Sequence, residues 1–187
     1  MEKKALKKYF TSGSFKLFIV GIVISVASVL WFIIRFTNAG RYVRIHFVEI
    51  LFLLIGPIFI FSAIKSSTKT RTLLSMLKRT NNINDVYLSF SNTAANISFK
   101  DNEIIISDKY LFLKDEVAVI PYQQITQMYT TYTRNSENEI TGISLFCDST
   151  QKTKILIFAN EKDTSVILQF AEIIRQKSPN IHFNLFS

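Results

Sequence analysis

The sequence predicts a membrane-anchored α+β protein, in which a two-helix transmembrane hairpin precedes a small antiparallel β-barrel or sandwich with one C-terminal helix. Two long apolar runs lie early in the 187-residue chain, short segments of alternating polarity follow them, and one stretch of helical period comes near the end. We expect a basic tail over 1–14, the hairpin over 15–64, a basic connector over 65–84 and the folded domain over 85–187.

Both apolar runs are long enough to cross a bilayer. Residues 17–34 (LFIVGIVISVASVLWFII) contain no charge, and residues 47–64 (FVEILFLLIGPIFIFSAI) contain only Glu49. At about 1.5 Å per residue, a run of this length spans about 27 Å, close to the hydrocarbon thickness of a bilayer. A signal peptide is the alternative for the first run. That run is long for one, no small-residue cleavage site follows it, and Arg35 ends it.

Basic residues flank the predicted hairpin unequally. Residues 1–84 carry 13 Lys and Arg against two carboxylates, whereas residues 85–187 carry nine against 12. Of the 13, only Arg35, Arg41 and Arg44 lie in the connection between the two helices. The positive-inside rule therefore predicts a multi-pass protein of the cell inner membrane with both termini in the cytoplasm. Because the domain has no basic stripe, we expect no nucleic-acid partner.

The predicted hairpin contains a candidate packing face and a candidate polar site. Gly21, Ser25 and Ser28 share one helical face, which lets a neighbouring helix approach closely. The second helix of the hairpin is the simplest partner, and a homo-oligomer stays open. Glu49 is the only ionisable residue in either run and so a functional candidate, although an interfacial ion pair with Arg35 also accounts for it.

The segments that flank the hairpin are basic and polar. Residues 1–10 (MEKKALKKYF) fit either a short basic amphipathic helix at anionic headgroups or a disordered tail. Residues 11–14 (TSGS) predict a break. In the connector, Leu73, Leu74 and Leu77 predict a short juxtamembrane helix that ends in a second break over 80–85.

From residue 86 the period of the sequence becomes two, which indicates β-structure. Short strands separated by turn residues are typical of a small barrel or sandwich. The expected strands are 86–91, 96–100, 103–107, 110–114, 117–120, 125–133, 142–147 and 154–159, with a short edge strand at 181–186. Residues 163–177 then place Val166, Phe170, Ile173 and Ile174 on one helical face, with Asp163 or Thr164 as the cap.

This order of strands and one C-terminal helix resembles the pleckstrin-homology-like (PH-like) domains of small bacterial membrane proteins, over roughly residues 85–180. The resemblance rests on short segments. They read IIISDKYLFLKD, VIPYQQITQMY, TGISLFCDS, KILIF and VILQFAEIIRQ. A different small barrel or a split α+β domain is the alternative fold.

The resemblance implies a cytoplasmic domain that binds proteins, lipids or peptides, or acts as a scaffold; fold alone does not decide among these. The phosphoinositide-binding members carry several Lys or Arg on the first hairpin. In this chain the corresponding stretch, SNTAANISFKDN, has Lys100 as its only cation, so a phosphoinositide site is not supported.

The residue pattern offers binding surfaces rather than catalytic chemistry. Tyr122, Gln127 and Tyr132 lie in a Thr/Tyr/Gln-rich segment that suits strand addition by a partner at a sheet edge, although an ordinary amphipathic strand also explains it. His46 and His182 have no metal-ligand spacing around them, and Cys147 lies in an apolar strand as a core thiol. No nucleotide or hydrolase motif occurs, so we expect no enzyme and no cofactor.

The sequence therefore predicts a non-catalytic, membrane-tethered binding or scaffolding protein. Its partners would be membrane lipids, through the hairpin and basic flanks, and a protein of unknown identity. A small accessory subunit of a transporter or channel, with the hairpin as the working part, is the alternative; Glu49 is the residue on which that alternative rests.

Overall fold

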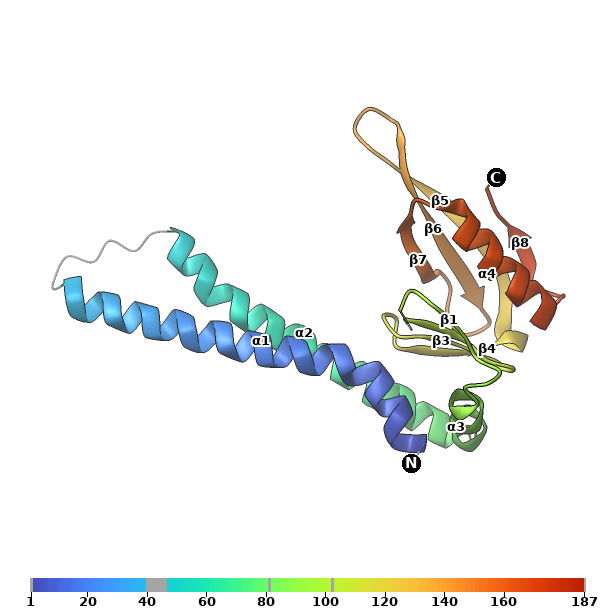
Figure 1. Cartoon of the computed structure of the whole chain (residues 1–187), viewed down its shortest axis with the longest axis horizontal. Coiled ribbons are helices and arrows are strands. Elements are labelled where there is room, and N and C mark those ends of the chain that lie inside the picture. The colour runs from blue at the N-terminus through green and yellow to red at the C-terminus, as the bar shows by residue number, and fades with distance from the viewer. Residues whose placement is uncertain (1, 40–46, 81, 102, 187) are drawn as a thin grey trace. The chain divides into compact units, whose positions relative to one another are not determined.

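The structure, a computed structural model, describes residues 2–39, 47–80, 82–101 and 103–186. It confirms the α+β class. The chain divides into a helical unit that ends at residue 81 and an α+β domain that begins at Asn82 (Figure 1).

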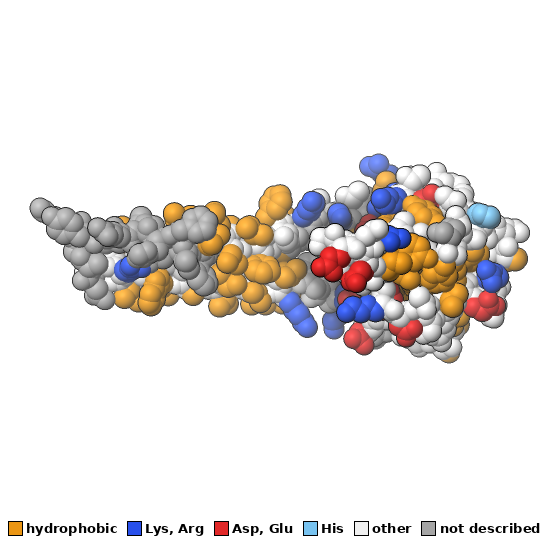
Figure 2. All heavy atoms as spheres, turned by 90° about the horizontal axis from the view of Figure 1, so that it is seen from above, with side chains coloured by type: hydrophobic (Ala, Val, Ile, Leu, Met, Phe, Trp, Pro, Cys, Tyr) orange, Lys and Arg blue, Asp and Glu red, His pale blue; other side chains and the backbone are white. Residues whose placement is uncertain are grey.

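The helical unit contains two long helices, α1 (Glu2–Ala39) and α2 (Phe47–Arg79). They lie antiparallel, because Ser14 of α1 contacts Ser66 of α2 while Gly21 lies against Ile60. Within the described residues, α1 is the one helix that is long and apolar enough to cross a membrane by length and composition. Hydrophobic side chains cover much of the described part of this unit on the face that Figure 2 shows.

Both helices are longer than the sequence predicts. The expected break at residues 11–14 is absent, and the connector from residue 65 to Arg79 continues α2. Hydroxyl groups in these segments donate to carbonyls one turn earlier, as Thr11 does to Lys7 (2.9 Å) and Thr70 to Ser66 (3.1 Å). Such bonds let Ser and Thr remain inside a helix instead of ending it.

The domain opens with a helix where the sequence predicts a strand. Residues 86–91 belong to α3 (Ile83–Ser91), which the acidic Asp85 in its first turn favours. Val86 and Phe90 lie one helical turn apart, and the Phe90 ring packs edge-on to Phe112 with centroids 5.2 Å apart. Alternation of Val, Leu and Phe over six residues fits a strand as well as a helix, so period alone cannot decide.

Within the described residues, eight strands form two sheets rather than the closed barrel that the sequence allowed. Sheet A is antiparallel in the order β1-β2-β3-β4, and sheet B has the order β7-β6-β5-β8 with β8 parallel to β5. The bounds are β1 Ile97–Phe99, β2 Ile104–Ile106, β3 Tyr110–Leu113, β4 Ala118–Pro121, β5 Ile125–Arg134, β6 Ile140–Ser149, β7 Ile155–Glu161 and β8 His182–Asn184. The 3-10 helix η1 (Tyr122–Gln124) carries the chain from one sheet to the other.

The two sheets and the C-terminal helix α4 (Thr164–Lys177) share one hydrophobic core. The Asp163 carboxylate accepts from the Ser165 backbone N–H at 2.9 Å and caps this helix, as the sequence predicts. Its buried face is centred on Ile167, Phe170 and Ile174, whereas Val166 and Ile173 are only partly buried. The Phe170 ring meets Phe158 of β7 edge-on, with centroids 5.1 Å apart.

Candidate functional site

The outer face of sheet B carries a row of half-buried aromatic and polar side chains. Gln127 and Tyr129 of β5 lie directly opposite Asp148 and Phe146 of β6. The Tyr129 and Phe146 rings stack with centroids 5.7 Å apart and planes at 19°. Lys154 adds a cation 5.5 Å from the Phe146 ring centroid. We call these five residues the Tyr129 face.

Hydrogen bonds fix the carboxylate of Asp148 within this face. It accepts from the Lys154 backbone N–H at 2.6 Å and from the Gln127 amide at 2.8 Å. The Lys154 bond first, and the Gln127 bond second, hold the pKa of Asp148 below its ordinary value. Burial, and next the charge of Asp148, raise the pKa of Tyr129. At neutral pH the face therefore presents an anion, a neutral phenol, an amide and a cation.

These groups suit recognition by hydrogen bonding and stacking. Tyr combines a large rigid contact area with a polar tip, which is why it is enriched at protein interfaces. On β8, His182 and Asn184 pair in register with Gln127 and Tyr129 and extend the polar surface beside them.

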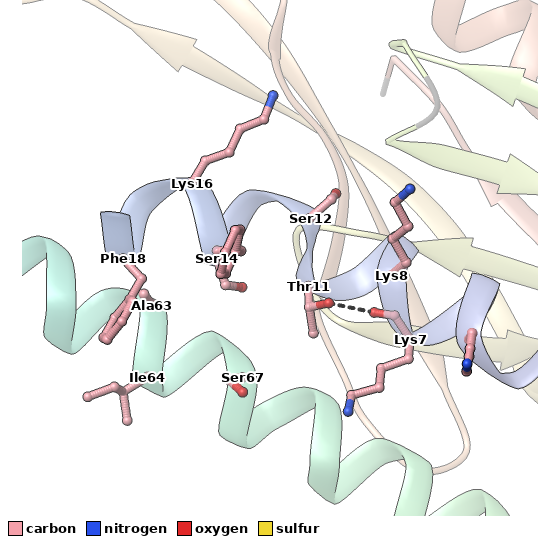
Figure 3. A pocket seen from close by; sticks show the side chains of 12 residues that line it. Lys7, Lys8, Thr11, Ser12, Ser14, Lys16, Phe18, Ala63, Ile64 and Ser67 are labelled. Carbon is pink, nitrogen blue, oxygen red and sulfur yellow. Dashed lines mark hydrogen bonds between the residues drawn. The ribbon is translucent and has the colours of Figure 1, made fainter. Parts of the chain in front are cut away.

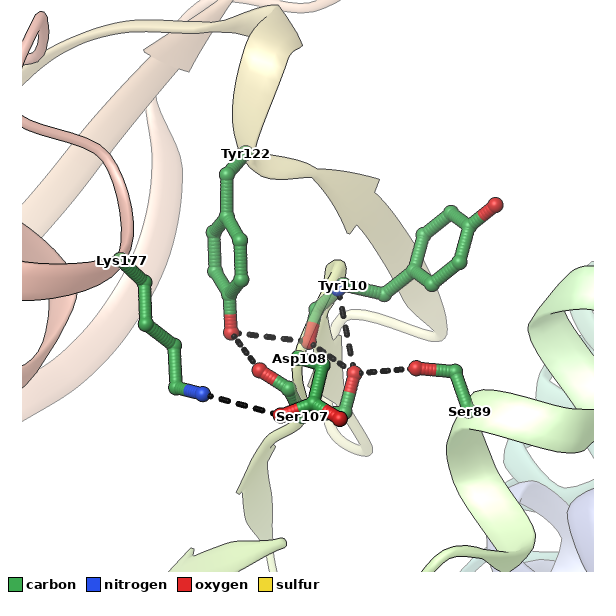
Figure 4. A network of polar contacts seen from close by, with 6 residues as sticks. All are labelled: Ser89, Ser107, Asp108, Tyr110, Tyr122 and Lys177. Atoms are coloured by element: carbon green, nitrogen blue, oxygen red, sulfur yellow. Dashed lines mark hydrogen bonds and ion pairs between the residues drawn. The ribbon is translucent and has the colours of Figure 1, made fainter. Parts of the chain in front are cut away.

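The structure places Tyr122 in the interior, away from any sheet edge. It lies in η1, and only 4% of its surface is exposed. Its hydroxyl donates to the carbonyls of Ser107 (2.8 Å) and Tyr110 (3.0 Å), and so ties η1 to the turn between β2 and β3 (Figure 4). Burial, and next the charge of Asp108, raise the pKa of this hydroxyl far above its ordinary value.

Other contacts complete the network around that turn. The Ser107 hydroxyl lies 2.7 Å from the hydroxyl of Ser89 on α3, and Lys177 of α4 pairs with Asp108 at 3.3 Å (Figure 4). These contacts hold α3 and α4 to the same turn. Tyr122 and Ser107 thus have a structural role.

Gln127 and Tyr132 point to opposite faces of β5, so the structure does not bring them together. Over residues 127–129, β5 lies between β6 and β8 and is not an edge strand. Tyr132 packs partly buried against the core, whereas Tyr129 lies on the outer face. Unbroken alternation from the buried Ile125 would set Gln127 and Tyr129 on the core side of β5; the β-bulge between Ile125 and Gln127 sets them on the outer face instead. Phe146, Asp148 and Lys154 were not candidates from sequence because their pairing with β5 is long-range.

In the helical unit, Gly21 and Ser25 of α1 lie against Gly56 of α2. An added Cβ at Gly21 would stand 2.9 Å from the Gly56 carbonyl oxygen, and one at Gly56 would collide with the Ser25 hydroxyl. Ser28 donates to the carbonyl of Ile24 in its own helix at 2.7 Å. Glu49 belongs to α2 by its backbone, but its side chain lies outside the described residues, as does all of His46.

A groove of about 710 Å³ lies between the first turns of α1 and the middle of α2 (Figure 3). We call it the basic groove, because four of its described lining residues are lysines and none of the described ones is acidic. Its lining residues are Lys4, Lys7, Lys8, Thr11, Ser12, Ser14, Phe15, Lys16, Phe18, Ala63, Ile64 and Ser67.

The single cysteine of the chain is not accessible to solvent. Cys147 of β6 is fully buried, and burial raises the pKa of its thiol to about 12. Among the described residues, no group of three or more His, Cys, Asp and Glu is placed to hold a metal ion.

Comparison of the chain with known protein families, with curated proteins and with solved structures finds no match. The resemblance to PH-like domains therefore stays a prediction from the sequence.

Proposed function

We propose that this protein is a non-catalytic membrane anchor that presents its α+β domain to a protein partner. In this proposal both α1 and α2 cross the bilayer, both termini lie in the cytoplasm, and the Tyr129 face binds the partner. The observation that carries the proposal is the register of the two helices, which sets their apolar runs side by side.

Contacts along the two helices fix that register. Ser14 meets Ser66, Gly21 meets Ile60, and Ser25 meets Gly56, so residue numbers rise along α1 as they fall along α2. Continued to both ends, this register sets residues 17–34 level with residues 47–64. Two apolar runs of equal length at the same level form one slab about 27 Å thick, which matches the hydrocarbon core of a bilayer.

The outward surface of the slab is apolar. Trp31 of α1 and Phe61 of α2 are 62% and 68% exposed, and many smaller apolar side chains around them are exposed as well. A soluble protein rarely exposes so continuous an apolar surface, whereas a lipid environment covers it at no cost. The excess of lysine and arginine at the Ser14–Ser66 end favours the cytoplasmic side for both termini.

The arrangement of polar groups in the domain supports binding rather than catalysis. The hydroxyl of Tyr122 is occupied by two carbonyls, and the thiol of Cys147 is buried and protonated. The Tyr129 face is the half-exposed cluster that combines an aromatic stack with charged groups. Attachment to the membrane raises the effective concentration of this face for other membrane-bound proteins, so each contact can be weak.

A photo-crosslinking residue at Thr131 in the full chain, expressed in its own membrane, tests this function. Thr131 is exposed on the outer face of β5, two residues from Tyr129. We expect a discrete cross-linked protein that Tyr129→Ser abolishes. The matched control is the same probe at Glu172, exposed on α4. Identical products from both positions, or a product that survives Tyr129→Ser, would refute the role of the Tyr129 face.

A further inference from the structure

The basic groove changes character along the axis of α1. Lys4, Lys7 and Lys8 line one end, and Phe15 and Phe18 line the other together with Lys16, with Thr11 between the two ends. Spacings of three and four residues set these side chains on one continuous face of the helix. The groove therefore runs from a cationic end to an apolar end.

The apolar end reaches the start of the apolar slab. Phe15 is 66% exposed and is separated from the uncharged run only by Lys16, and Ala63 and Ile64 of α2 complete this end of the groove. If the slab lies in the hydrocarbon core, Phe15 and Lys16 lie at its boundary, Phe18 lies just inside it, and Lys4, Lys7 and Lys8 lie beyond it on the aqueous side.

Among the described side chains, no Asp or Glu lines the cationic end of the groove. Figure 3 shows the Lys7 side chain extending toward α2 and the Lys8 and Lys16 side chains extending away from it. Lysine ammonium groups sit on flexible four-carbon stems, so exposed ones can turn toward a bound anion while their stems remain on the apolar wall.

We infer that the basic groove is a binding site for an anionic phospholipid. The phosphate lies at Lys4, Lys7 and Lys8, and an acyl chain follows Phe15, Phe18 and Ile64. This inference rests on the proposed membrane crossing of α1 and α2. A soluble phosphate would satisfy the lysines but leave the phenylalanine end uncovered, so the combination of charge and apolar wall identifies a lipid.

Native mass spectrometry of the detergent-purified full chain, titrated with phosphatidylglycerol or phosphatidylcholine, tests the inference. The variant Lys4→Gln/Lys7→Gln/Lys8→Gln should bind phosphatidylglycerol at least about tenfold more weakly, because each lysine near the surface contributes to anionic lipid binding. The matched control Lys65→Gln/Lys69→Gln/Lys78→Gln removes the same charge from α2 residues that do not line the groove. It should retain binding within about threefold.

A second pair of variants tests whether lipid binding needs the space in the groove as well as its positive charge. Ser67→Trp fills the groove without altering any charge and should also lose phosphatidylglycerol, whereas Thr68→Trp, on the exposed neighbouring residue, should not. Equal losses in both lysine triples, or unaltered binding in Ser67→Trp, would overturn the site. Displacement of the lipid by equimolar glycerol phosphate would assign the site to a soluble anion instead.

Alkaline carbonate extraction of membranes distinguishes failure of the inference from failure of the proposed function. If carbonate releases the chain, the chain does not span the membrane, and both the proposed function and the lipid site are refuted. If the chain stays in the membrane but Lys4→Gln/Lys7→Gln/Lys8→Gln binds phosphatidylglycerol as tightly as the unaltered protein, only the lipid site is refuted.

Discussion

The close approach of α1 and α2 at Gly56 can be tested with a single methyl group. In Gly56→Ala the new Cβ would collide with the Ser25 hydroxyl and stand 2.9 Å from two backbone atoms, the Gly21 oxygen and the Ser25 nitrogen. A side chain can rotate away, but backbone atoms of a helix cannot. The helices must therefore move apart. Gly13→Ala is the matched control, since nothing lies within 4 Å of a Cβ built there.

The magnitude follows from two opposing terms. Replacing Gly by Ala in a helix favours the helix by about 0.5–1 kcal/mol. Overpacking a close contact costs about 1–3 kcal/mol. With central values of about 2 and about 0.75 kcal/mol, Gly56→Ala should weaken the α1–α2 contact by about 1.3 kcal/mol, or about tenfold, whereas Gly13→Ala should leave it unaltered or slightly stronger.

A disulfide across the same pair of helices measures this contact. Ser14 and Ser66 have hydroxyl oxygens 2.8 Å apart, so cysteines at these positions in a Cys147→Ala background should form a disulfide readily. In a glutathione redox buffer, the disulfide equilibrium gives the effective concentration of the two thiols. Gly56→Ala should lower that concentration about tenfold. Equal values for Gly56→Ala and Gly13→Ala would refute the close packing at Gly56.

Three further predictions concern the domain. Tyr122→Phe removes the Tyr122 donor from the Ser107 carbonyl, whereas the Tyr110 carbonyl still accepts from the backbone N–H and the hydroxyl of Ser107. The variant should lower the free energy of unfolding by about 1–2 kcal/mol in urea denaturation followed by tyrosine circular dichroism, and no loss would remove Tyr122 from the network. Cys147 should resist maleimide at pH 8 in the native protein and react after denaturation, because its pKa is about 12; rapid native labelling would contradict its burial. Folding lowers the pKa of Asp148, so its contribution to the free energy of unfolding is complete above its unfolded pKa and is lost as pH falls through the folded pKa. Asp148→Asn should therefore have a lower free energy of unfolding than the unaltered protein at pH 7 and an equal one in strong acid. A difference that stays constant with pH would refute this.

Local signals in the sequence predict much of the fold. The Asp163 cap and the spacing of Phe170 and Ile174 predict α4 almost to the residue. The absence of charge over residues 17–34 predicts the membrane-length helix. These features succeed because both the signal and the structure it specifies are contained in a few consecutive turns.

Long-range pairing explains what local signals miss. Nothing near Pro121 indicates that β5 joins a second sheet, because that choice depends on its pairing with β6 and β8. The bulge after Ile125 sets Gln127 and Tyr129 on the outer face and Tyr132 toward the core, so Gln127 is the one candidate of β5 that lies on the outer face. A shift of one residue in a strand exchanges its two faces. A site assigned by counting from one end of the strand therefore depends on the absence of bulges.

The most direct test of the account is the membrane sidedness of three single cysteines in a Cys147→Ala background. The positions are Ser12 in the first turns of α1, Thr37 near its end, and Asn138 in the turn between β5 and β6. If both helices cross the membrane, an impermeant maleimide should label only the Thr37→Cys protein in intact cells and only the other two in inverted vesicles. Labelling of Thr37→Cys and Asn138→Cys from the same side would show that α2 does not cross, and would contradict the proposed anchor.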